Sequence, residues 1–174
     1  MFNTYSDKEY RKTTIDWING LPYNFCIAIS LHLPNSYKSE RHVWDSPALT
    51  KCLQYYFNCV DSKVLGSANR YKHLRVPRFI THEYKDTTGW HAHGLLSPDS
   101  TRLTAIEIME HLETIWENKV LKEHKGGKLE KRLFYAEPVH GDYSAYITKS
   151  LATNDWPLAG QIDIQNCWLG RPSS

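Results

Sequence analysis

Two strand-like segments joined by a very short connection constrain the fold of this chain more than any other feature. The segments are RFITHEY at 78–84 and WHAHGLL at 90–96, and the sequence KDTTG at 85–89 joins them. The connection has the length and the turn-forming residues of a hairpin loop. Strands this close along the chain pair as antiparallel neighbours, because a parallel pair needs a much longer crossover. The sequence therefore predicts a β-hairpin here.

The rest of the chain alternates between the periods of strands and of helices. Residues 23–33 place apolar side chains on one face and small or polar ones on the other, which predicts a strand. Ser46 and Pro47 have the residue types that begin a helix, and Thr104 and Glu107 have the spacing of a capping box. The expected elements are strands at 23–33, 78–84, 90–96, 132–138 and 160–170, and helices at 46–60, 104–121 and 143–151, the last capped by Asp142.

This order, β-α-β-β-α-β-α-β, predicts an α+β fold in which helices pack on a central antiparallel sheet, ferredoxin-like or RNA-recognition-motif-like. The 174 residues suit a single domain, with a core over about 23–166. We find neither an apolar run of transmembrane length nor a secretory leader, so we expect a cytoplasmic protein without a membrane partner. Reduced packing thiols are expected at the four cysteines, which show no C-x-x-C pairing: Cys26, Cys52, Cys59 and Cys167.

The hairpin places three side chains of metal-binding types together. His91 and His93 lie on one face of their strand because side chains alternate, and Glu83 on the preceding strand falls roughly opposite them. One carboxylate and two imidazoles suit a divalent ion with open coordination positions, Mn²⁺ or Mg²⁺. His82 points to the opposite face, although a β-bulge would exchange it with Glu83. An H-x-H pair is also expected by chance about 0.5 times in such a composition.

Basic residues gather in segments that are predicted as loops or edges of elements. We expect these basic segments to contact single-stranded nucleic acid, because aromatic residues or histidines are interleaved with the basic residues in one segment. The alternative is that they are ordinary exposed lysines and arginines. The formal net charge of +2 does not by itself indicate nucleic acid. The candidate DNA-binding residues are Arg70, Lys72, Arg75, Arg78, Lys128, Lys131 and Arg132.

A second cluster of reactive side chains occurs on the predicted helix at 143–151. Tyr146 and Lys149 are one turn apart and share a face, and Tyr143 precedes Tyr146 by one turn. Tyr143 lies beside Asp142 at the helix N-terminus, where a phenolate would be favoured, so it is a second candidate nucleophile. A Y-x-x-K pattern alone is expected about 0.8 times by chance, and its meaning depends on the other motifs.

The order of these motifs resembles the HUH endonuclease superfamily, and most closely the single-tyrosine replication initiators (Rep proteins) of rolling-circle replicons. The resemblance covers roughly 23–151 and rests on Glu83 with His91-Ala92-His93 and on Tyr146 with Lys149. It implies that His91, His93 and Glu83 hold a divalent ion, that Tyr146 attacks a DNA phosphate, and that Lys149 assists. The small Ala92 departs from the bulkier apolar residue that the family often has.

The resemblance also implies a function. Such proteins nick one strand of single-stranded or hairpin origin DNA through a 5′-phosphotyrosyl intermediate and rejoin it. No Walker-A motif occurs, so we expect this chain to recruit a host helicase and polymerase, or to be an excised nuclease domain. The alternatives are a single-tyrosine transposase or relaxase of the same superfamily, and a non-catalytic nucleic-acid-binding domain in which histidines and tyrosines only stack on bases.

Overall fold

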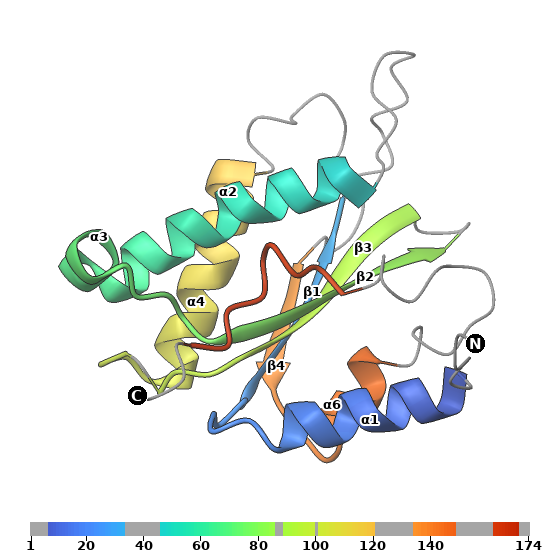
Figure 1. The fold of residues 1–174 in the computed structure, drawn as a ribbon. Helices are drawn as coiled ribbons and strands as arrows, with labels where there is room; N and C mark the ends of the chain where they lie inside the picture. The colour runs from blue at the N-terminus through green and yellow to red at the C-terminus, as the bar shows by residue number, and fades with distance from the viewer. Residues whose placement is uncertain are drawn as a thin grey trace, which may run out of the picture.

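The computed structural model describes residues 7–33, 46–85, 89–99, 101–120, 134–148 and 162–170. These ranges form an α+β domain in which helices cover both faces of one sheet (Figure 1). The elements in chain order are α1 (Asp7–Asn19), β1 (Ile27–His32), α2 (Ser46–Leu65), α3 (Ser67–Lys72), β2 (Arg78–Lys85), β3 (Gly89–Leu96), α4 (Ala105–Ile115), the π-helical turn η1 (Trp116–Val120), β4 (Phe134–Pro138) and α6 (Tyr143–Ile147).

The four strands form an antiparallel sheet in the order β2-β3-β1-β4. The connection β1-α2-β2 leaves room for β3 between its two strands, and β3-α4-β4 leaves room for β1 in the same way. Two interlocked split β-α-β units of this kind define the ferredoxin-like arrangement. The predicted fold class is confirmed, and the 78–96 hairpin pairs in a single unbroken register.

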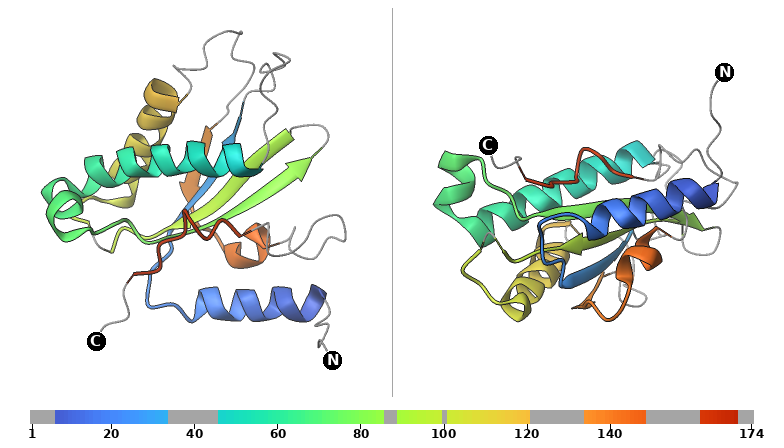
Figure 2. Two further views of the ribbon diagram at one scale, coloured as in Figure 1. Left: turned by 45° about the horizontal axis from the view of Figure 1, so that its top comes forward. Right: turned by 60° about the horizontal axis from the view of Figure 1, so that its bottom comes forward.

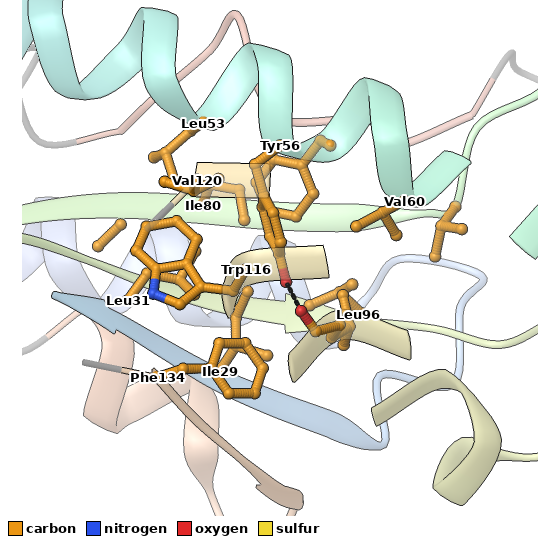
Figure 3. Close-up of a cluster of buried hydrophobic side chains, with 14 of the residues drawn as sticks. Ile29, Leu31, Leu53, Tyr56, Val60, Ile80, Leu96, Trp116, Val120 and Phe134 are labelled. Carbon is orange, nitrogen blue, oxygen red and sulfur yellow. Dashed lines mark hydrogen bonds between the residues drawn. The ribbon is translucent and has the colours of Figure 1, made fainter. Parts of the chain in front are cut away.

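One face of the sheet packs against α2, α4 and η1 (Figure 1). The apolar side chains of β1 enter this core, where they meet Tyr56 of α2 and Trp116 of η1, both fully buried (Figure 3). The Tyr56 hydroxyl donates a hydrogen bond to the carbonyl of Leu112 on α4, at 3.0 Å. This bond satisfies a polar group that would be costly to bury unpaired, and it joins the two covering helices.

The opposite face of the sheet is covered in part by α1 and α6, as the two views of Figure 2 show. A smaller apolar cluster forms there from Ile18 of α1, Phe79 of β2, Leu95 of β3 and Ile147 of α6. Helix α1 was not predicted, because its sequence is largely polar and only Thr14 and Ile18 are buried. Among the described residues, no helix combines the length and the apolar character that a membrane crossing requires.

The segment 162–170 runs along β2 but is not the regular edge strand that the sequence predicted. It joins β2 by isolated bridges, Arg78 with Trp168 and Thr81 with Ile162. Between the bridges the chain turns, with Asn166 and Cys167 both donating backbone hydrogen bonds to the carbonyl of Asp163. The alternation at Ile162 and Ile164 therefore reflects a short turn, and Ile164 is 77% exposed.

A buried ion pair fixes β2 to α2. The guanidinium of Arg78 makes two bonds to Asp61, at 2.8 and 3.1 Å, and its Nε donates to the carbonyl of Asn166. Arg78 is 2% exposed and Asp61 is fully buried. Burial lowers the pKa of Arg78 from its ordinary value, whereas the charge of Asp61 opposes that shift. The pair thus joins α2, β2 and the 162–170 segment at one point.

Replacing Asp61 with Asn keeps the side chain shape but leaves the buried charge of Arg78 without its counter-ion. We expect Asp61→Asn to lower the free energy of unfolding by about 3 kcal/mol, as for other buried pairs that lose one partner. Urea denaturation followed by circular dichroism measures the change. Asp16→Asn, an exposed position on α1, is the matched control. Equal stability of the two variants would contradict a structural role for the pair.

Candidate metal and tyrosine site

The candidate metal ligands meet because of the strand register. Glu83 on β2 is directly opposite His91 on β3, and His93 is opposite Ser30 on β1. Residues opposite one another in adjacent strands point to the same face of a sheet, and so do residues two apart in one strand. All of these side chains therefore lie on the face of α1 and α6, at the end of the sheet where the 85–89 connection begins.

The carboxylate of Glu83 lies between the two imidazoles. Its Oε2 is 3.0 Å from Nε2 of His91 and 3.0 Å from Nε2 of His93. One candidate ligand atom from each residue lies within 4.8 Å of the other two. The imidazoles are 2% and 4% exposed and the carboxylate side chain 10%. A carboxylate and two convergent, nearly buried ring nitrogens could supply three ligands to a divalent ion and would leave coordination positions open.

Side chains of β1 orient the two histidines. Ser30 Oγ lies 2.8 Å from Nδ1 of His93, and the ring of His32 stacks on His91 with centroids 4.9 Å apart and planes 9° from parallel. If the Nδ1–H of His93 is donated to Ser30, Nε2 carries the lone pair that a metal ion needs. Neither Ser30 nor His32 was singled out from the sequence, although the alternation of 23–33 assigns both to its polar face.

His82 lies on the other face of the sheet, as alternation predicted. Its Nε2 is 2.8 Å from Oδ2 of Asp163, and its Nδ1 is 3.2 Å from Oγ of Ser46. Asn166 completes this buried network by donating to the carboxylate of Asp163 and to the carbonyl of Thr50. His82 therefore attaches the 162–170 segment to β2 and α2, and it is separate from the candidate metal ligands.

The two candidate nucleophiles both lie beside the triad, but in different surroundings. The ring of Tyr146 packs edge-on against His93, with centroids 5.4 Å apart, and Tyr146 is 43% exposed. The Tyr143 ring lies 5.0 Å from that of Tyr146 and is half-buried. Burial, and next the charge that Tyr146 would carry, raise the pKa of Tyr143 to about 12. The surroundings of Tyr143 thus disfavour its phenolate form.

Helix α6 is held in place from both ends. Asp142 caps it by accepting from the backbone N–H of Ala145, and the hydrogen bonds from Ser144 and Ala145 lower the pKa of Asp142. Arg11 of α1 donates to the carbonyl of Ala145 at 2.7 Å, and Thr81 of β2 donates to the carbonyl of Ile147 at 3.1 Å. These contacts fix the backbone that carries Tyr146. The predicted cap is confirmed, and Lys149 lies outside the described residues.

Among the predicted DNA-binding residues, those whose side chains the structure describes, Arg70, Arg75 and Arg78, are not part of this site. Arg70 is exposed on α3, and Arg75 bonds to Asn58 and Asp61 and lies over the ring of Trp168. Arg70 and Arg75 both lie toward the start of β2, whereas Glu83 lies near its other end. Arg78 is a correction: its guanidinium is buried against Asp61, so it is not a surface contact for phosphate.

Other predicted residues in the basic segments cannot be placed. The side chain of Lys72 is outside the described part, and so are the candidate residues of the second basic segment, Lys128, Lys131 and Arg132. The cysteines are free thiols, as expected.

A cleft of about 350 Å³ adjoins the triad, and sequence reasoning missed most of it. Ser30 and Tyr146, which contact His93, form part of its lining. The rest of the lining comes from β4, α6 and the loop between them: Tyr135, Glu137, His140, Asp142 and Tyr143. Tyr135 and Glu137 are two apart on a strand and so share its face, a signal that the sequence contained.

Comparisons with known proteins give one distant likeness. No family model and no curated protein matches the chain. A solved structure of the non-structural protein-1 N-terminal nuclease domain of minute virus of mice is similar over 83% of this chain and 82% of that chain, at 15% identity and a TM-score of 0.29. That structure is described as showing Zn²⁺ coordination in the active-site pocket and DNA recognition at the origin of replication.

The ligand set makes a direct prediction about metal binding. We expect the protein to bind Mn²⁺ in isothermal titration calorimetry. Glu83→Ala and His91→Ala should each lower the Mn²⁺ affinity by more than about 100-fold. Losing even a residue that only hydrogen-bonds to a metal ligand lowers metal affinity by about 10- to 100-fold. His111→Ala, a histidine on α4 remote from the triad, is the matched control. Unchanged affinity in the two ligand variants would exclude the triad as the binding site.

Proposed function

We propose that this protein is an HUH-type endonuclease that nicks and rejoins single-stranded DNA through a covalent tyrosyl intermediate, as a single-tyrosine initiator of rolling-circle replication. The observation that carries the proposal is the convergence of the Glu83, His91 and His93 ligand atoms within 4.8 Å, with the exposed ring of Tyr146 packed on His93. Three ligands and a nucleophile on one sheet face are the parts that such a reaction needs.

A divalent ion bound here, Mn²⁺ or Mg²⁺ by our proposal, would polarise the scissile phosphate and offset the negative charge that develops on it. The residues that would hold the ion are Glu83, His91 and His93. Ser30 fixes the ring of His93 through the 2.8 Å contact at Nδ1, and His32 supports the ring of His91 by stacking. The strand pairing thus supplies a rigid support, which keeps the ligands in place when DNA binds.

Tyr146 is the proposed nucleophile. Its oxygen would form a bond to phosphorus while the bond from phosphorus to the 3′ oxygen breaks, which leaves a free 3′-OH and a 5′-phosphotyrosyl link. The phenolic proton passes to solvent, and the departing 3′ oxygen takes up a proton from solvent. The ammonium of Lys149, whose role rests on the sequence motif, would favour the phenolate by its charge. Because the link conserves the phosphodiester, attack by a 3′-OH reverses the step and rejoins the strand. Tyr143 is the weaker candidate, since its raised pKa, about 12, opposes formation of its phenolate.

Binding of the DNA strand requires more surface than the triad. We propose that the exposed Arg70 and the basic side chains of Lys72, Lys128, Lys131 and Arg132 contact its phosphates, and that Arg75 does so where it is exposed. The substrate is single-stranded or hairpin origin DNA, because an in-line attack needs an unpaired, accessible phosphate. We also propose that a host helicase and a host polymerase act as partners in the reaction.

A denaturing-gel assay for a covalent adduct tests this function. Wild-type protein is incubated with Mn²⁺ and a labelled library of single-stranded hairpins, and we expect a denaturation-resistant protein–DNA band that requires the metal ion. Tyr146→Phe removes only the hydroxyl, so it should eliminate the band. Tyr143→Phe is the matched control and should retain at least part of it. Peptide mapping should then locate the nucleotide on Tyr146.

Other outcomes have distinct meanings. An adduct on Tyr143 would overturn the assignment of the nucleophile but keep the enzyme class. A protein that binds the hairpins and never forms an adduct, with or without metal, would overturn the proposed nuclease in favour of a non-catalytic binding domain. A band that survives chelation of all divalent ions would contradict the role of the triad.

A further inference from the structure

The cleft beside the triad contains groups that the proposed reaction does not use, among them Tyr135 and Glu137 of β4. Ser30 of β1 and the α6 residues Tyr143 and Tyr146 also line it. It connects directly to the metal ligands, because Ser30 bonds to His93 and Tyr146 packs on the same ring. Tyr135 is opposite Ser30, and Ser30 is opposite His93, so two strand spacings, about 10 Å, separate Tyr135 from His93 in the sheet.

The charges of the cleft do not suit a phosphate group. Two carboxylates, Glu137 and Asp142, line it, and none of the described lining residues is a lysine or arginine. A DNA phosphate placed there would be repelled. The aromatic rings instead offer faces on which a base can stack, which contributes about 1–3 kcal/mol per base in single-strand binding proteins. The cleft therefore suits a base of the bound strand better than its backbone.

The two carboxylates differ in their freedom to meet such a base. Asp142 already accepts hydrogen bonds from the Ser144 hydroxyl and the Ala145 N–H, as the cap of α6. Glu137 accepts from the Tyr135 hydroxyl at 2.6 Å through Oε2, and each carboxylate oxygen has two lone-pair sites. The Tyr135 bond also holds the Glu137 side chain in place. Glu137 is thus the acceptor group that can read a base edge.

We propose that this cleft is a base-recognition pocket for guanine, in which Glu137 reads the Watson–Crick edge of one nucleotide near the scissile phosphate. A carboxylate only accepts hydrogen bonds, and guanine presents two adjacent donors, N1–H and the N2 amino group, that match its two oxygens. Adenine and cytosine each place a ring acceptor beside their single amino group, and thymine flanks its N3–H with two carbonyls. Those neighbouring acceptors would face the carboxylate and repel it.

The pocket rests on the proposed function, since it names the base that accompanies the reacting phosphate. Tyr135 lines the cleft and is 42% exposed, so a stacked base would cover it. Binding of a base needs neither the metal ion nor the nucleophilic hydroxyl. The pocket can therefore be tested in the presence of a chelator, independently of cleavage.

The experiment compares short oligonucleotides by fluorescence anisotropy in EDTA. The four oligonucleotides are an unchanged oligothymidylate of about 12 nucleotides, within the range of single-strand site sizes, and three copies with one central position changed to guanine, adenine or cytosine. The strand can slide until the central base meets the pocket. We expect the guanine oligonucleotide to bind wild-type protein about tenfold more tightly than the other three, as for a bidentate base contact.

Glu137→Gln should reduce this preference to less than about twofold, because the amide replaces one acceptor with a donor. Glu117→Gln makes the same change of charge at an exposed position of η1 and should keep the preference. Tyr135→Ala should weaken binding of all four oligonucleotides through lost stacking. Equal binding of all four to wild-type protein, or a preference that survives in Glu137→Gln, would overturn the guanine pocket alone. Failure to bind any of them would overturn the proposed function and the pocket with it.

Discussion

The pairing of β2 with β3 is the constraint on which the rest of the site depends. It sets Glu83 opposite His91, and a slip of one residue would move the carboxylate to the other face of the sheet. Gly94 helps to fix this register. A Cβ there would lie 2.6 Å from Cδ1 of Ile80 and 3.0 Å from Cγ1 of Ile29, so a larger residue would force these side chains to shift. A slipped pairing would place a larger residue at that point.

Polar groups buried on the opposite face of the sheet support the same strand. The Arg78–Asp61 pair ties the start of β2 to α2, and the contacts of His82 with Asp163 and Ser46 tie its later part to the 162–170 segment and to α2. Buried groups of this kind cost free energy to desolvate, and removing one partner costs more than the pair contributes. These buried contacts therefore form together in only one position of β2 relative to α2. That position of β2 also sets the position of Glu83.

The sequence predicted those parts of the structure that depend on local periodicity. The five-residue connection and the two-residue period of the strands were enough to place Glu83, His91 and His93 on one face and His82 on the other. Parts that depend on distant partners were missed. The sequence pattern predicts a surface position for Arg78, because its partner Asp61 lies far away in the chain, on α2. It does not predict α1, whose position depends on tertiary contacts such as that of Arg11 with α6. The cleft at Glu137 needed the strand order, which brings β4 beside β1.

The most direct test of this account is the position of a bound ion in a crystal of the protein soaked with Mn²⁺, measured by anomalous scattering at the manganese edge. The account predicts a single strong peak on the α1 and α6 face, about 2 Å from the Glu83 carboxylate and from the Nε2 atoms of His91 and His93. The Ser30 contact at Nδ1 of His93 should persist. A crystal in which those three side chains keep their mutual hydrogen bonds, while manganese binds elsewhere or not at all, would contradict it.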